Sequence, residues 1–344
     1  MKRGITRILV LTSLLLASRA GLHAQDPQYT QFYANQQMLN PAFAGAALGP
    51  RVTLNYRAQW VAIPGSYRQT AAGYDQPLLI GKSLHGVGLL LHSDRAGEGN
   101  LSKTYINGNY SFAVPFGRRG HEQYLRFGLG GGIEQASIDF TKLRFSDQID
   151  PREGFVRATN EIGSNQARFN PDVHFGLAYY NQYAWVGLSA HHLTEPYQTF
   201  ITSQRNNSTQ LPRKYTATAG LRLPIGQPNN PEAVVLSPSI LFMNQRNFNQ
   251  LNIGTYLTIE PMVFGLYYRT NYNNFAGAFV ASDAIAGLVG FRQGIFSIGY
   301  SYDYTISRLT NGISGGSHEL AVVVEFERNK PSVFKHRKMP CPRF

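Results

Sequence analysis

Beyond its first 24 residues, the sequence lacks any run of about 18 apolar residues, which is the length that a membrane-spanning helix requires. It also lacks a pair of cysteines, because Cys341 is the only one, and no disulfide can form within the chain. Charged residues are scarce, at 15% against about 25% in soluble domains. If the chain lies in a membrane, it must cross it as a β-barrel, since in lipid only helices and closed barrels satisfy every backbone polar group. The alternative is a secreted β-sandwich or barrel, for which so low a charge is less expected.

Residues 1–24 have the pattern of a secretory signal peptide. Lys2 and Arg3 precede the apolar run at residues 8–17, and the small Ala24 offers a cleavage site. No cysteine follows the apolar run, so no lipid anchor is indicated. We predict that this segment is removed on export.

The remaining sequence alternates between apolar and polar or small residues, as the strands of a membrane barrel do. Residues 173–180 show the pattern clearly, with apolar side chains at every second position from Val173. The same alternation in residues 125–134 directs Arg126 and Glu134 toward the lumen. Glycine (34), tyrosine (20) and phenylalanine (21) are abundant, which suits strands that face lipid.

These patterns predict an all-β protein, a transmembrane antiparallel β-barrel of about 14 strands that occupies residues 49–328. An even number is what single-chain bacterial barrels require. The predicted strands cover residues 51–60, 66–77, 85–94, 101–114, 123–137, 171–181, 183–192, 213–224, 232–243, 248–258, 261–270, 283–292, 294–304 and 317–327.

The connections between the predicted strands sort by length onto two sides, apart from two short connections on the long-loop side, Val61–Gly65 and Asn244–Asn247. One side receives the long connections 138–170, 193–212, 271–282 and 305–316, and the other receives short turns such as 181–183. Outer-membrane barrels have short periplasmic turns and longer outside loops, so both chain termini are predicted to be periplasmic. The longest loop has mixed charge, and we expect it to be solvated or to contact a partner at the cell surface.

Residues 25–48 do not have the pattern of a wall strand, because they are polar and aromatic and are interrupted by Pro27 and Pro41. A barrel of fourteen strands has a lumen wider than side chains alone readily fill. We therefore predict that residues 25–48 plug the lumen, with a short helix over Tyr29–Leu39 that ends before Asn40 and Pro41. The alternative is a periplasmic strap that leads into the first strand.

The formal net charge is +12, and much of the positive charge lies in the C-terminal tail, residues 329–344. Six basic residues fall in the last 17 residues, which contain no Asp or Glu: Arg328, Lys330, Lys335, Arg337, Lys338 and Arg343. Prolines argue against a helix or strand there, so we predict an extended periplasmic segment that docks to an acidic or anionic partner. The alternative is a disordered tail with no specific partner. Because the basic charge lies in an exported tail rather than on a structured face, no nucleic-acid binding is predicted.

The sequence has no nucleophile elbow, paired zinc-ligand spacing or glycine-rich phosphate loop between a predicted strand and a predicted helix, as these motifs require. We therefore predict a protein that is not an enzyme and has no cofactor. His174 and His191 are expected to approach each other on the lumen side of neighbouring strands, whereas His192 should point the opposite way. Two histidines without a third ligand do not make a metal site, and none is predicted.

Residues 25–45, QDPQYTQFYANQQMLNPAFAG, resemble the N-terminal signature of the PorP/SprF family of outer-membrane proteins from the type IX secretion and gliding apparatus. The last four residues, Cys341–Phe344, resemble the ending of the same family. The plug motif that the resemblance marks consists of Tyr29, Phe32, Asn40, Pro41, Phe43 and Gly45. The expected partner-binding residues are Arg328 and the five basic residues of the tail, together with Cys341, Pro342 and Phe344.

The resemblance implies a non-enzymatic outer-membrane component that associates with periplasmic and outer-membrane secretion proteins. In some family members it also implies help in exporting or displaying a particular surface protein. The element Asn40-Pro41-Ala42 is also similar to the N-terminal hatch of the FadL family, whose members are fourteen-stranded transporters of hydrophobic compounds. The alternative function is therefore a FadL-like channel for small hydrophobic molecules.

Overall fold

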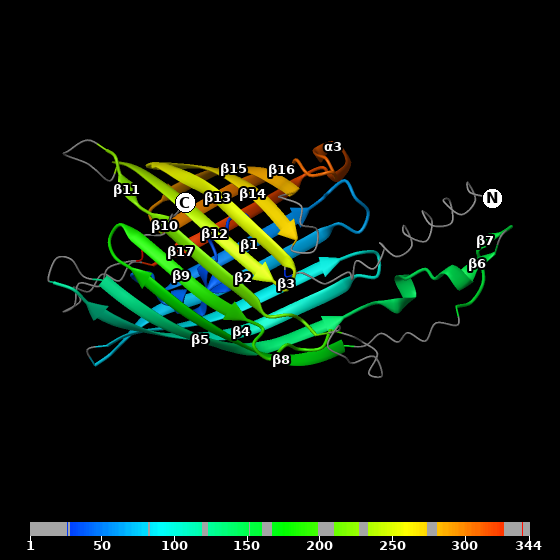
Figure 1. Ribbon diagram of the computed structural model, residues 1–344, viewed down its shortest axis with the longest axis horizontal. Coiled ribbons are helices and arrows are strands. Elements are labelled where there is room, and N and C mark those ends of the chain that lie inside the picture. The colour runs from blue at the N-terminus through cyan, green and yellow to red at the C-terminus, as the bar shows by residue number, and fades with distance from the viewer. Residues whose placement is uncertain are drawn as a thin grey trace, which may run out of the picture.

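The structure is a computed structural model in which fourteen antiparallel wall strands form one closed barrel (Figure 1). It describes residues 26, 28–81, 83–118, 123–150, 152–159, 167–198, 210–226, 233–273, 281–326 and 339. The predicted signal peptide lies outside these residues. None of the helices in the described ranges is long and apolar enough to span a membrane.

The wall strands follow one another around the barrel in chain order. They are β1 (Arg51–Gln59), β2 (Tyr67–Ile80), β3 (Ser83–Ala96), β4 (Leu101–Phe116), β5 (Gln123–Ser137), β8 (Ala167–Tyr180), β9 (Ala184–His191), β10 (Lys214–Leu221) with its continuation β11 (Leu223–Pro224), β12 (Val234–Gln245), β13 (Phe248–Ile259), β14 (Met262–Asn273), β15 (Ala281–Gln293), β16 (Phe296–Thr305) and β17 (Ser317–Glu325). The last strand pairs with the first, from Arg51 opposite Glu325 to Gln59 opposite Ser317, and this pairing closes the barrel. The predicted fourteen-stranded antiparallel barrel is confirmed.

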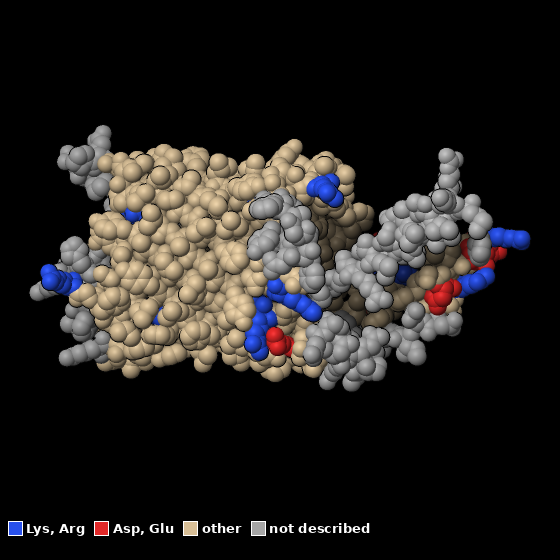
Figure 2. Space-filling view, in the orientation of Figure 1, with Lys and Arg blue, Asp and Glu red and all other residues tan. Residues whose placement is uncertain are grey.

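The period of two decides which side chains line the lumen. On β1, Leu54 and Tyr56 are exposed on the outer face, whereas the alternate residues Asn55 and Arg57 are buried on the inner face. Arg126 and Glu134 are both fully buried, as the alternation predicted. Figure 2 shows the result on the surface, where the side of the barrel carries few charged residues and most of those visible gather toward its ends. Such an apolar belt is what a barrel presents to lipid.

The two ends of the barrel differ in their connections. Short turns such as the one at residues 260–261 join strands at one end, and longer loops such as residues 306–316, with α3 (Asn311–Ser314), lie at the other. The connection from β5 to β8 extends well beyond the barrel (Figure 1). It contains η2 (Phe140–Lys142), η3 (Ser146–Gln148) and the small hairpin of β6 (Ile149–Asp150) and β7 (Gly154–Phe155). Within it, the backbone N–H of Arg152 and the guanidinium of Arg157 hold the pKa of Asp150 below its ordinary value.

The segment before β1 passes through the lumen as a plug, which we define as residues 28–48. Nearly all of its side chains are buried, and it contains α2 (Gln36–Leu39) and η1 (Pro41–Phe43). The helix is shorter than the predicted Tyr29–Leu39, because residues around Thr30 direct their backbone N–H groups to the barrel wall instead of to a helical turn. It ends before Asn40 and Pro41, as predicted.

The plug runs along the whole lumen. Its last residues precede Arg51 at the short-turn end, where β17 also ends, in agreement with the strand parity. Asp26, however, contacts Gln245 and Lys214 at the long-loop end. The chain therefore enters the described part of the lumen at the end opposite to the one expected for the N-terminus. The even number of strands fixes only the end of the barrel at which the first strand begins. A segment that precedes this strand is free to fold back through the lumen.

Candidate functional site

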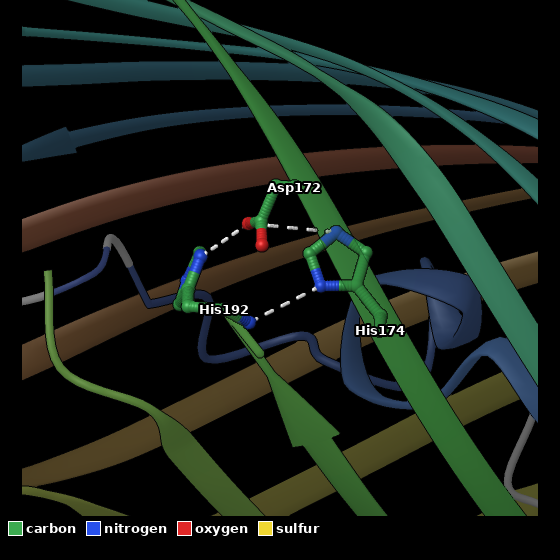
Figure 3. A group of neighbouring side chains, drawn as sticks. All are labelled: Asp172, His174 and His192. Carbon is green, nitrogen blue, oxygen red and sulfur yellow. Dashed lines mark hydrogen bonds and ion pairs between the residues drawn. The ribbon is translucent and has the colours of Figure 1, made fainter. Parts of the chain in front are cut away.

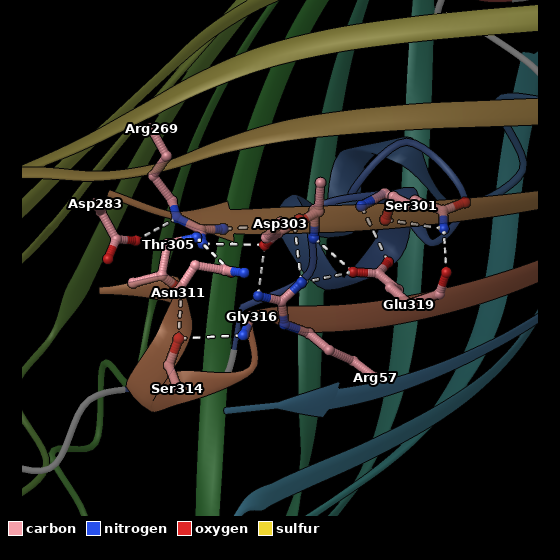
Figure 4. Close-up of polar contacts among 12 residues, drawn as sticks. Arg57, Arg269, Asp283, Ser301, Asp303, Thr305, Asn311, Ser314, Gly316 and Glu319 are labelled. Carbon is pink, nitrogen blue, oxygen red and sulfur yellow. Dashed lines mark hydrogen bonds and ion pairs between the residues drawn. The ribbon is translucent and has the colours of Figure 1, made fainter. Parts of the chain in front are cut away.

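Buried charged side chains of the wall strands form an ion network near the long-loop end, and the plug bonds to this network (Figure 4). Arg57 of β1 donates through Nη2 to Asp303 Oδ2 at 2.7 Å and through Nη1 to Glu319 Oε2 at 3.2 Å. All three side chains are at most 1% exposed. Arg269 of β14 adds a second cation, with Nη2 at 3.0 Å from Asp303 Oδ2. Charges buried in this way are stable only while each one keeps its partners.

The plug completes this network with its own backbone. The backbone N–H groups of Thr30 and Gln31 donate to the two oxygens of Glu319 at 2.7 Å and 3.0 Å. The Thr30 hydroxyl lies within hydrogen-bond distance of both Asp303 oxygens, and Arg57 donates to it at 2.8 Å. The wall carboxylates therefore bind the plug directly. Removal of the plug would leave these buried carboxylates without some of their hydrogen-bond donors.

The plug contacts the wall again toward the short-turn end, around Gly45. We call this region and the ion network the two plug anchors. The backbone N–H of Gly45 donates to Asp75 Oδ2 at 2.7 Å, and the same carboxylate is paired with Arg51 through Oδ1 at 2.9 Å. Arg126 donates to the carbonyl of Ala44 at 2.7 Å and to that of Gly45 at 3.2 Å. Gly45 has φ of +64°, and a Cβ there would lie 2.6 Å from the backbone of Gln76, so only glycine fits this turn.

Between the anchors, Asn40 fixes the plug to the strands β8 and β9. Its Nδ2 donates to the carbonyls of Leu177 and Leu188, each at 3.0 Å. Its Oδ1 accepts from the backbone N–H of Ala42 at 2.8 Å and so caps η1, whose first residue is Pro41. The predicted motif residues Asn40 and Pro41 therefore place the plug against β8 and β9.

Aromatic side chains fill the rest of the lumen. The ring of Phe32 lies 5.7 Å from that of Tyr267, and the ring of Tyr33 lies 6.0 Å from that of Trp185. Phe43 is 1% exposed within the same apolar cluster. Cavities of about 50 and 30 Å³ lie beside the plug, against the roughly 300–1,000 Å³ of a typical small-molecule site. The described lumen is packed rather than open.

Replacing Asn40 with alanine is expected to lower the free energy of unfolding by about 1–3 kcal/mol, because the buried N–H of Ala42 loses its acceptor and two carbonyls lose a donor. Urea unfolding of the refolded barrel, followed through Trp185 fluorescence in a Trp60→Phe background, measures the change. Gln135→Ala, which removes an exposed amide from β5, is the control and should change stability by less than about 0.5 kcal/mol. Equal effects of the two substitutions would contradict the role assigned to Asn40.

The histidines agree only in part with the prediction. The rings of His174 and His191 lie 4.9 Å apart on the lumen side, as expected. The prediction that His192 points away is wrong, because its side chain is buried and bonded to Asp172 and Asp26. His192 follows the end of β9 with φ of +58°, and this left-handed conformation interrupts the alternation that the prediction assumed.

The predicted partner-binding residues of the tail, Arg328, Lys330, Lys335, Arg337, Lys338, Cys341, Pro342, Arg343 and Phe344, lie outside the described residues. Met339 is described. Its side chain is 3% exposed in the apolar cluster, and its backbone N–H donates to the carbonyl of Ala46 at 3.4 Å. The tail therefore touches the plug at this residue.

A closed barrel with an apolar outer face and a lumen filled by its N-terminal segment defines the class of plugged outer-membrane β-barrel proteins. Comparison of the sequence with protein families shows to which family of this class the chain belongs. A sequence model of the type IX secretion system membrane protein PorP/SprF matches residues 22–324, and the chain belongs to this family.

Comparison with solved structures finds similar barrels at low identity. The toluene transporter TodX of P. putida shares 10% identity, with 86% of this chain and 95% of TodX covered and a TM-score of 0.44. The monoaromatic hydrocarbon channel CymD shares 10% identity, with 86% and 94% covered and a TM-score of 0.45. BamA from Haemophilus ducreyi shares 8% identity, with 80% and 70% covered and a TM-score of 0.39. No curated protein sequence matches the chain.

Proposed function

We propose that this protein is a plugged outer-membrane anchor of the type IX secretion apparatus, which docks periplasmic secretion components and assists the export or display of a surface protein. It acts by binding partners rather than by catalysis. The packed plug is the observation that carries the proposal, because its described residues occupy the lumen, where an exported polypeptide would otherwise pass, and contact the wall at both ends.

The same packing argues against the alternative, a channel for small hydrophobic molecules. The cavity of about 30 Å³ is lined mainly by apolar side chains, including Phe32, Leu241 and Met243, but it has room for about one water molecule. A hydrocarbon ligand would require displacement of the plug, which is held by buried charges at one end and by Asp75 and Arg126 at the other.

The short-turn end supports a docking role. Both the end of β17 and Met339 lie there, and Met339 contacts the plug at Ala46. We propose that a periplasmic partner with an acidic surface binds the basic residues of the tail on this side of the barrel. Attraction of this kind mainly raises the association rate and weakens with salt.

Replacing Arg328 and the five basic residues of the tail with glutamine is expected to abolish co-purification of periplasmic secretion proteins at physiological ionic strength. A matched variant that exchanges each of them between lysine and arginine keeps the charge and should retain the partners. Pull-down of the tagged barrel from native membranes, with quantitative mass spectrometry, measures both. Deletion of residues 329–344 should give the same loss. Unchanged partners after the glutamine replacement and the deletion would refute docking through the tail.

A further inference from the structure

A cluster of buried histidine and aspartate side chains lies in the lumen near the long-loop end, outside the plug anchors (Figure 3). Asp172 and His174 project from β8, and His192 follows β9. One potential ligand atom from each side chain lies within 4.8 Å of the others. We propose that these three residues bind one divalent transition-metal ion, of which Zn²⁺ fits the ligand set best.

His174 provides the observation that points to a ligand. Its side chain is buried, and its Nε2 has no hydrogen-bond partner, although Asp172 Oδ2 lies 3.8 Å away. Its Nδ1 accepts a long hydrogen bond, 3.4 Å, from the backbone N–H of His192. An ion at Nε2 keeps the imidazole neutral with its proton on Nδ1, so the unpartnered nitrogen gains a ligand at the cost of one weak hydrogen bond.

His192 has the environment of a metal-binding histidine. Its Nδ1 faces Asp172 Oδ2, and its Nε2 lies 2.7 Å from Asp26 Oδ2. Histidines that bind metals through one nitrogen commonly donate the other N–H to a carboxylate, which fixes the ring orientation and raises its basicity. Asp26 is itself held by Lys214, whose Nζ is 2.6 Å from the same oxygen. An ion between His192 and Asp172 replaces the proton that these two groups share.

The ligand set selects the kind of ion. Two imidazoles and one carboxylate suit Zn²⁺ and similar metals, whereas Mg²⁺ and Ca²⁺ prefer oxygen ligands alone. Ligand atoms around tetrahedral Zn²⁺ are about 3.3 Å apart, so small rotations of the three side chains bring them onto one ion. The adjacent cavity of about 50 Å³, lined by His174 and His192, has room for a water molecule as fourth ligand.

The position of the site indicates what the ion does. It joins β8 to the connection between β9 and β10, and through the bond from His192 to Asp26 it reaches the first described residue of the N-terminal segment. A bound ion therefore clamps the start of the plug at the end of the lumen away from Met339. This inference is independent of the proposed docking function, because it concerns neither the tail nor a partner protein.

Calorimetric titration with Zn²⁺ alone tests the site in the complete mature barrel, purified in detergent and treated with a chelator. We expect one tightly bound ion per chain. His174→Ala and His192→Ala should remove this binding, and Asp26→Asn should weaken it about 10–100-fold. His85→Ala is the matched control, because His85 lies on β3 with its Nδ1 bonded to Tyr110 and should leave binding unchanged.

Co²⁺ binding to the unaltered protein tests the ligand geometry without any substitution. We expect the intense visible absorption bands of a four-coordinate ion, and Zn²⁺ should displace them. Heat-dependent migration in gels shows whether each variant still forms a barrel. The site is refuted if the unaltered protein fails to bind Zn²⁺, or if folded His174→Ala and His192→Ala barrels bind it as the His85→Ala control does.

Discussion

Replacing Arg57 with methionine is expected to lower the free energy of unfolding by about 3–5 kcal/mol, the typical result of removing one partner from a buried ion pair. Arg57 is paired with Asp303 and Glu319, and all three are at most 1% exposed. Asp303 keeps Arg269, but among the described residues Glu319 keeps only the backbone N–H groups of Thr30 and Gln31. The cost arises from the negative charge left in the lumen rather than from lost volume, since methionine is of similar length.

The same reasoning predicts a partial recovery. Adding Glu319→Gln to the Arg57→Met variant removes the unpaired charge, so the double variant should be more stable than Arg57→Met alone. Arg292→Ala is the control, because Arg292 pairs with Glu260 at 3.5 Å on the surface and should contribute about 0–1 kcal/mol. Urea unfolding with Trp185 fluorescence, in the Trp60→Phe background, measures all variants. If Arg57→Met and Arg292→Ala are equally stable, the ion network does not hold the plug.

Much of the barrel could be predicted from the sequence because alternation is a local property. Each strand carries its own period of two, and the strands at residues 123–137 and 317–327 were predicted to within two residues of β5 and β17. The main discrepancy is β8, which begins at Ala167 instead of residue 171. Pro171 has no backbone N–H to donate, yet the pairing with β5 continues through it to Ala167.

The contacts of the site could be predicted only in part, because they depend on which strands become neighbours. Alternation places Arg57 and Glu319 on lumen faces, yet they lie 262 residues apart. They meet because closure of the barrel sets β1 against β17 with Arg57 opposite Glu319, and no local pattern contains that register. His192 was predicted wrongly for a different reason, since one residue with positive φ reverses the side of the chain that the period of two would assign.

Inner-wall glycines explain how the plug fits against the wall. At Gly128 of β5, an added Cβ would lie 2.1 Å from the backbone nitrogen of Ala42. Gly176 of β8 is equally close to the plug, with a Cβ position 1.9 Å from Asn40 Oδ1. Real Cβ atoms do not approach backbone so closely, so a side chain at Gly128 must displace the turn of the plug around Pro41 and Ala42.

Replacing Gly128 with leucine is therefore expected to open the barrel. The unaltered protein should show no steady ion conductance in planar bilayers, whereas the Gly128→Leu variant should show discrete channel openings, because a lumen of fourteen strands is wide enough to fill with water once the plug moves. The unfolding free energy should also fall by about 1–3 kcal/mol from overpacking. Single-channel recording and urea unfolding measure the two effects.

Gly287→Leu separates opening of the lumen from a general effect of leucine in a wall strand. Gly287 lies on β15, and a Cβ there meets nothing within 4 Å, so this variant should stay closed and stable. Conductance that appears with leucine at residue 128 and not at residue 287 shows that the plug seals the lumen. Steady conductance of the unaltered protein would contradict both the seal and the anchor function that depends on it, since an open barrel could itself serve as a conduit.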